Sequence, residues 1–116
     1  MIEIPTFQNQ SADFNQEISL ESKLVQLRIV WNSRVEFFFL KFIDQEGSEL
    51  KGIKIVPDWP LLDWNKGFID FDGDLMVQKV DLEAGSEITY DNFGNGWNLF
   101  YMTPAEVSEW KTANGF

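Results

Sequence analysis

Two adjacent apolar segments constrain the fold of this chain more than any other feature of its sequence. Residues 23–31 alternate between apolar and polar side chains, which is the period of a β-strand with one buried face. The apolar positions are Val25, Leu27, Ile29 and Trp31. After a polar turn at 32–34, residues 35–43 are apolar at most positions, as in a strand that is central in its fold or half-buried against a partner. The sequence therefore predicts an antiparallel hairpin over residues 23–43.

Shorter runs of the same kind lie on both sides of this hairpin. The predicted strands are 3–7, 14–20, 49–56, 68–71, 75–80, 87–90 and 97–102. The loop at 44–47 ends in Gly47, where the chain needs a positive φ, and Gly52 indicates a β-bulge in the strand that follows. Residues 57–67 contain two prolines and predict a loop. Short strands at spacings of about 8–12 residues predict an all-β fold, either a small antiparallel β-sandwich or a barrel.

The C-terminal residues change to a helical pattern. Thr103, Pro104 and Glu106 have the spacing of a capping box with proline in the first turn. Asn114 and Gly115 supply a stop signal. We therefore expect a short helix at about 104–112, in a single domain that spans residues 1–116.

The composition excludes several classes of function. The 116 residues include neither Cys nor His, so the chain has no disulfide, no thiolate nucleophile, no usual zinc ligand set and no histidine base. Nineteen acidic residues against nine basic ones give a net charge of −10, which disfavours nucleic acid and anionic membranes as partners. Residues 1–5 lack the pattern of a signal peptide, and we expect synthesis in a cytoplasm. From this composition we expect a protein that is not an enzyme and uses no cofactor.

An acidic segment at 70–74 resembles part of a calcium-binding loop. Asp70, Asp72 and Asp74 alternate there, but the sixth and twelfth positions hold Leu75 and Asp81, where the EF-hand needs Gly and Glu. We interpret the segment as a solvated acidic hairpin and assign no metal ligand, with a looser cation site left open. A small hydrolase that uses a pair of carboxylates is a further alternative.

Aromatic side chains are the candidate contact residues. Trp59 and Trp64 lie in a loop bounded by prolines, and aromatic residues in loops are typical anchors of protein–protein contacts. The apolar strand at 35–43 adds three candidates, Phe37, Phe39 and Phe42. The alternative is a small β-sandwich that binds carbohydrate on an aromatic platform. That platform would consist of Trp59, Trp64, Trp97 and Tyr101.

The polar turn and the charge distribution have structural interpretations. We assign Asn32 and Arg34 to the turn, where an Asn tolerates positive φ and bonds nearby backbone groups. Residues 58–91 contain nine acids against Lys66 and Lys79, whereas residues 23–54 hold six of the nine bases. Such a division suits an assembly aligned by electrostatics, and it also fits an ordinary soluble surface.

The order of these motifs resembles a family of phage tail proteins, the baseplate plug proteins of contractile-tailed cyanophages. The similar motifs are the turn at 32–34 before an aromatic strand, the hairpin at 44–47, the segment 52–57, the leucine pair at 61–62, the turn at 72–75 and the stretch 91–101. The resemblance covers residues 27–102. It implies a structural virion protein at the distal end of the tail tube near the baseplate hub, which helps to close the lumen until contraction. The implied partners are hub and tube proteins and copies of the chain itself, in a virion assembled in the host cytoplasm.

Overall fold

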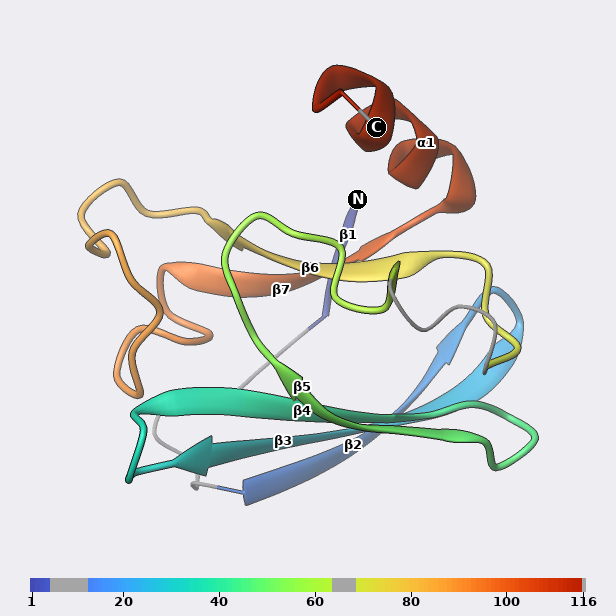
Figure 1. Ribbon diagram of the computed structural model, residues 1–116, viewed down its shortest axis with the longest axis horizontal. Helices are drawn as coiled ribbons and strands as arrows, with labels where there is room; N and C mark the ends of the chain where they lie inside the picture. Colours follow the sequence, from blue (N-terminus) through green and yellow to red (C-terminus); the bar gives the residue numbers. More distant parts are fainter. Residues whose placement is uncertain (5–12, 64–68, 116) are drawn as a thin grey trace.

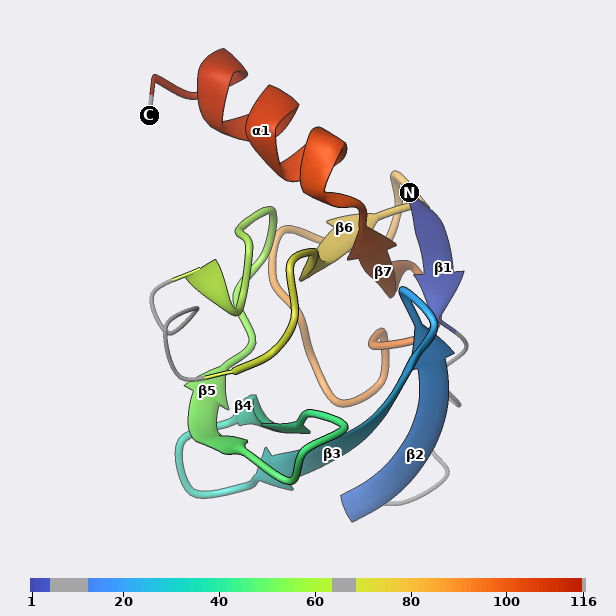
Figure 2. The same ribbon diagram turned by 90° about the vertical axis from the view of Figure 1, so that its right-hand side faces the viewer.

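Two antiparallel sheets face each other in the computed structural model, which describes residues 1–4, 13–63 and 69–115 (Figure 1). The larger sheet has the order β2 (Asp13–Leu20), β3 (Lys23–Asn32), β4 (Phe37–Ile43) and β5 (Glu49–Lys54). The smaller sheet has the order β1 (Ile2–Ile4), β7 (Trp97–Met102) and β6 (Asp74–Lys79). The one helix of the described residues, α1 (Pro104–Ala113), lies outside the smaller sheet (Figure 2). The predicted all-β sandwich is thus confirmed, and the sheets do not close into a barrel.

The predicted hairpin is the centre of the larger sheet. Its register places Trp31 opposite Phe38 and Ile29 opposite Leu40. The pairing of β4 with β5 shifts after Leu40, so that two residues of β5 lie opposite one residue of β4. The extra residue falls at Gly52, whose φ is +67°, which confirms the predicted bulge.

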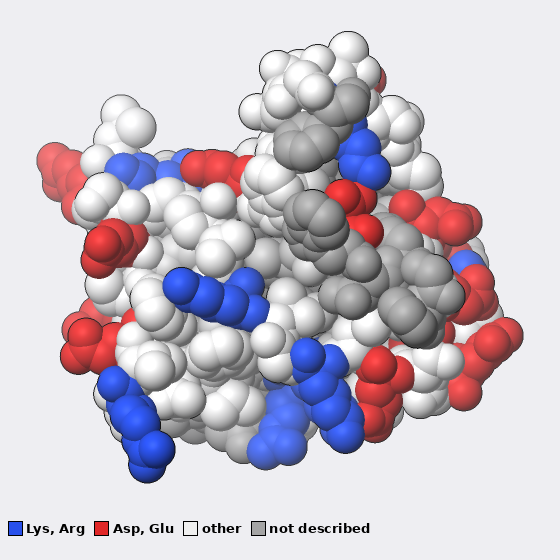
Figure 3. All heavy atoms as spheres, in the orientation of Figure 1, with Lys and Arg blue, Asp and Glu red and all other residues white. Residues whose placement is uncertain are grey.

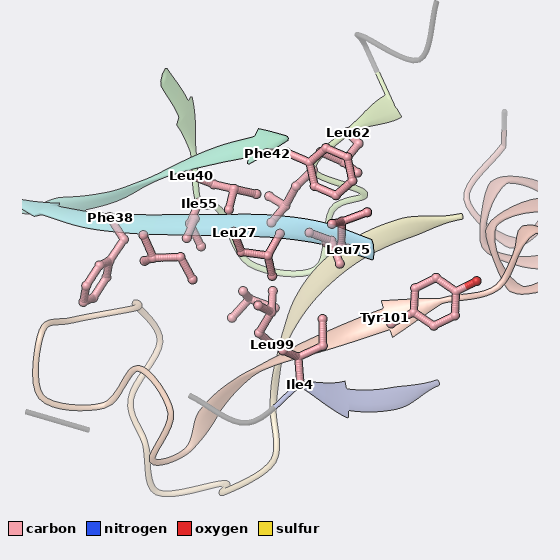
Figure 4. Packing of buried hydrophobic residues seen from close by; sticks show 14 of the residues in the cluster. Ile4, Leu27, Phe38, Leu40, Phe42, Ile55, Leu62, Leu75, Leu99 and Tyr101 are labelled. Carbon is pink, nitrogen blue, oxygen red and sulfur yellow. The ribbon is translucent and has the colours of Figure 1, made fainter. Parts of the chain in front are cut away.

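The core fills the space between the two sheets. Leu27, Leu40 and Leu99 are at most 1% exposed and come from both sheets. Figure 4 shows them between the layers, with Phe38 toward one end of the core and Tyr101 toward the other. Each fully buried side chain of this size contributes about 1.5–3 kcal/mol to folding. The apolar positions predicted from the alternation in residues 23–31 therefore hold the sheets together.

Two predicted strands are wrong. Residues 87–90 form no strand, and neither do 69–71, while Phe68 lies outside the described residues. Ile88 and Tyr90 nevertheless pack against the core, and Phe71 is buried in it. These short apolar runs cover open parts of the sandwich without pairing as strands.

The N-terminal strands differ in length from the prediction. β1 occupies residues 2–4, and residues 5–7 of the predicted strand lie outside the described part of the chain. β2 begins at residue 13 and pairs with β3 along its whole length. β1 is an edge strand of the smaller sheet, and β2 is an edge strand of the larger sheet.

The terminal helix begins with the predicted capping box. The Thr103 hydroxyl accepts from the Glu106 N–H at 3.2 Å, and a Glu106 carboxylate oxygen accepts from the Thr103 N–H at 3.0 Å. Glu106 also forms an ion pair with the amino group of Met1, which ties the helix to β1. Its pKa is lowered by this amino group and by the Thr103 N–H. In the described residues, no helix is both long and apolar enough to cross a bilayer.

Candidate interaction surfaces

The outer face of β4 presents two of the three phenylalanines predicted as contact residues. Phe37 is 40% exposed and Phe39 is partly buried. Phe42 is 0% exposed, and its ring packs on that of Phe71 with centroids 5.1 Å apart. The prediction for Phe42 is therefore wrong as far as a surface contact is concerned. Strand alternation points it inward, and it has no surface to offer a partner.

Cations surround Phe39 on this outer face. Arg28 of β3 lies directly opposite Lys41 of β4, and Lys51 of β5 is nearby. Glu49 forms ion pairs with Lys41 at 3.3 Å and with Lys51 at 3.4 Å. The hydrogen bond from Lys41, followed by that from Lys51, lowers the pKa of Glu49.

A shallow hollow of about 370 Å³ lies among these side chains. We define the basic sheet face as five of the residues that line it, namely Arg28, Val30, Phe39, Lys41 and Lys51. In Figure 3, Lys and Arg side chains gather over the lower part of the molecule, where β4 and β5 lie, whereas Asp and Glu lie mainly at its sides. The basic sheet face thus combines apolar and cationic groups on a strongly acidic protein.

An aromatic cleft of about 400 Å³ opens between the larger sheet and residues 86–91. Trp31 packs edge-on against Phe38 at 4.8 Å and against Tyr90 at 5.6 Å between ring centroids. At the mouth, Lys54 Nζ lies 3.5 Å from the centroid of the Phe37 ring. This cation–π contact shows that the wall of the cleft can hold a positive charge.

Carboxylates and a rigid loop complete the cleft. Glu36, Glu87 and Asp91 line it together with the aromatic rings. The Asn92 side-chain amide donates to the carbonyl oxygens of Ala84 at 2.9 Å and Glu87 at 2.8 Å, which fixes the loop. An apolar cleft with acidic groups beside it can receive an apolar or cationic side chain from another protein.

Of the two loop tryptophans predicted as contact residues, the structure describes one. Trp59 is partly buried and packs edge-on against Trp110 of α1, with ring centroids 5.3 Å apart. An ion pair of 2.7 Å between Lys111 and Asp63 reinforces the same contact between loop and helix. Trp64 lies outside the described residues. A role of Trp59 in binding a partner stays a prediction, since part of its ring already contacts the helix.

The turn before β4 is built as predicted for Asn32, with one difference. The Asn32 side-chain oxygen accepts from the N–H of Arg34 at 3.0 Å and of Val35 at 3.4 Å. The positive φ of the turn falls on Glu36, at 58°, and not on Asn32. Arg34 is exposed in the turn, and a structural role for its side chain stays a prediction.

A comparison with protein families finds a match over most of the chain. The model of one family, described as the cyanophage baseplate Pam3 plug gp18, matches residues 1–104. The chain belongs to this family. Among curated proteins, none matches the sequence.

The match to the baseplate plug family is longer than the resemblance seen in the sequence. It includes residues 1–26, which the resemblance over 27–102 left out, and therefore takes in all seven strands of the described fold. It ends at Pro104, the first residue of α1, so nearly all of the helix lies beyond it. The family supports a structural role in the phage baseplate.

The acidic segment at 70–74 is not the solvated hairpin predicted for it. Asp74 is buried, and its Oδ1 accepts from the N–H of Leu62 at 2.8 Å and of Leu75 at 2.6 Å. Asp70 is paired with Lys23 at 2.9 Å, and this hydrogen bond raises the pKa of Lys23. Within the part of the chain that the structure describes, no three His, Cys, Asp or Glu side chains are grouped as metal ligands would be.

Asp44 secures this segment to the larger sheet. Burial opposes its ionisation, but N–H groups of Asp70, Ser48 and Glu46 donate to its carboxylate at 2.8–2.9 Å and hold its pKa below the ordinary value. This role of Asp44 was not predicted from the sequence, although an Asp at the start of a Gly-containing turn is a typical signal for it.

The predicted carbohydrate platform is dispersed. Trp97 and Tyr101 are both buried in the core, so their faces cannot stack on a sugar. The Tyr101 hydroxyl donates to Glu21 at 2.5 Å, and burial together with this carboxylate raises the Tyr101 pKa. Trp31, Phe38 and Tyr90 form a separate aromatic group, in the aromatic cleft.

Proposed function

We propose that this chain is a structural protein of a contractile phage tail that lies at the distal end of the tail tube, near the baseplate hub. There it would help to close the lumen until contraction. The observation that carries the proposal is the match of residues 1–104 to the cyanophage baseplate plug family. We place its assembly in the host cytoplasm, which suits a chain that contains no Cys and needs no disulfide.

The aromatic cleft is the surface that we assign to a neighbouring hub or tube protein. Phe37 is half-exposed at its mouth, and Trp31 and Tyr90 form its wall. Aromatic residues at the centre of a contact commonly supply most of its binding energy. Such a contact could hold the closed assembly and be lost when the assembly rearranges at contraction.

We propose no catalytic role for the chain. A sequence without His or Cys lacks the usual bases and nucleophiles. In the acidic segment at 70–74, Asp74 accepts from backbone N–H groups and Asp70 pairs with Lys23, so these two carboxylates serve the fold. The net charge of −10 likewise favours protein partners over nucleic acid or an anionic membrane.

The test is incorporation of variants into phage particles. Phe37→Ala removes the exposed ring at the cleft, and Leu24→Ala is the matched control because Leu24 is 53% exposed on the same sheet. Quantitative mass spectrometry of purified particles, relative to the tube protein, should show several-fold less of the Phe37 variant and normal amounts of the Leu24 variant.

Two results would contradict the proposal at different levels. Absence of the wild-type chain from intact particles would exclude a tail component. Equal incorporation of the Phe37 and Leu24 variants would leave the chain in the tail but remove the cleft as its contact surface.

A further inference from the structure

The loop between β6 and β7 exposes an apolar side chain at its tip. Leu82 is 92% exposed and Val80 is 54% exposed. Acidic residues flank the tip at Asp81 and Glu83, and both are exposed. We call Val80, Asp81, Leu82 and Glu83 the acidic loop tip.

Local hydrogen bonds hold this tip in one conformation. The Asp81 side chain accepts from the Glu83 N–H at 2.9 Å, and the Ala84 N–H donates to the Asp81 carbonyl at 3.0 Å. The Val80 N–H donates to the Gly96 carbonyl at 2.7 Å, which anchors the start of the loop. Leu82 is thus presented to solvent by an ordered turn, and binding would cost little conformational entropy.

The basic sheet face has the complementary chemistry. Its hollow of about 370 Å³ offers Val30 and Phe39 to an apolar side chain, with Arg28, Lys41 and Lys51 around them. Glu49 pairs with both lysines, and the group as a whole keeps a net positive charge. The acidic loop tip brings one apolar side chain between two carboxylates. Apolar groups would meet apolar groups, and opposite charges would meet around them.

The acidic loop tip cannot contact the basic sheet face of its own chain. The loop extends from the end of the smaller sheet, whereas the basic sheet face lies on the outer side of the larger sheet (Figure 1). A contact between two different surfaces of identical chains is heterologous, and it produces a ring where the rotation closes and a stack where it does not.

We propose that the acidic loop tip of one copy docks on the basic sheet face of a second copy, giving head-to-tail assemblies. This inference goes beyond the proposed baseplate role, and its failure would leave that role unaffected. The net charge of −10 makes two copies repel at long range, but at physiological salt this repulsion is screened beyond about 8 Å. The local contact between opposite charges then decides the association.

The experiment compares two surface variants by analytical ultracentrifugation of the 116-residue chain. The loop variant carries Leu82→Ser with Glu83→Lys, and the face variant carries Arg28→Glu with Lys51→Glu. All four positions are exposed, so circular dichroism should show both variants folded. Wild-type chain at physiological salt should gain mass as its concentration rises, whereas each variant alone should stay monomeric.

Mixing and a charge control make the test specific. An equimolar mixture retains one intact loop tip and one intact sheet face, so it should form a 1:1 dimer that grows no further. Glu109→Lys on α1 makes the same charge change as Glu83→Lys at another exposed position, and it should associate at least as well as wild type. A monomeric wild type, a mixture without dimer, or a loop or face variant that associates like wild type would overturn the proposal.

Discussion

Replacing Phe42 by Ala tests whether one face of β4 belongs to the core while the other forms the contact surface. Phe42 is 0% exposed and packs on Phe71, so its removal leaves a cavity between the sheets. Substitutions of buried Phe by Ala cost about 3–5 kcal/mol. For a domain of this size that corresponds to a fall in Tm of about 12–20 °C, at roughly 4 °C per kcal/mol.

Phe37→Ala is the matched variant on the opposite face of β4. Its ring is 40% exposed, and its clearest contact is the cation–π contact with Lys54. Such a contact at an exposed site contributes about 0.5–1 kcal/mol, so Tm should fall by only about 2–4 °C. Thermal unfolding followed by circular dichroism measures both values. Equal shifts for the two variants would refute the division of β4 into an inner and an outer face.

Three further predictions concern backbone and polar contacts. Asp44→Asn should destabilise the fold by about 1–3 kcal/mol at pH 7. The folded-state pKa of Asp44 lies below its ordinary 3.8, so the stabilisation by its carboxylate is present above that pH and is lost in acid. In urea unfolding, the difference in free energy of unfolding between wild type and variant should therefore narrow below about pH 4. Gly73→Ala should lower the free energy of unfolding by about 1–3 kcal/mol in the same assay. The added Cβ would overlap the Met102 carbonyl oxygen and lie 2.7 Å from a Tyr101 ring carbon. An unchanged urea midpoint would contradict that packing. Thr103→Ala should lower stability by about 1 kcal/mol through loss of the helix cap, with Tm unaffected if the cap is unimportant.

The sequence predicts the features that local rules determine. Alternation over residues 23–31 assigns Leu27 and Ile29 to the core, and the spacing of Thr103 and Glu106 gives the start of α1. Gly52 marks the bulge because few other residues adopt its φ of +67°. These signals depend on neighbouring residues alone, so they do not need the tertiary fold.

The features that sequence reasoning missed depend on contacts between distant residues. The apolar run at 87–90 has the composition of a strand, but Asn92 fixes its backbone through the carbonyl of Glu87. None of the described strands pairs with it. Asp74 is buried because the Leu62 N–H, twelve residues away, needs an acceptor. The aromatic cleft combines residues from β3, β4 and this loop, and no spacing along the chain reveals such a grouping.

The most direct test of a baseplate role is cryo-electron microscopy of purified phage particles that encode this chain. We expect density for its two facing sheets and external helix within the baseplate at the distal end of the tail tube. A baseplate map in which every chain is assigned to other sequences would contradict the account.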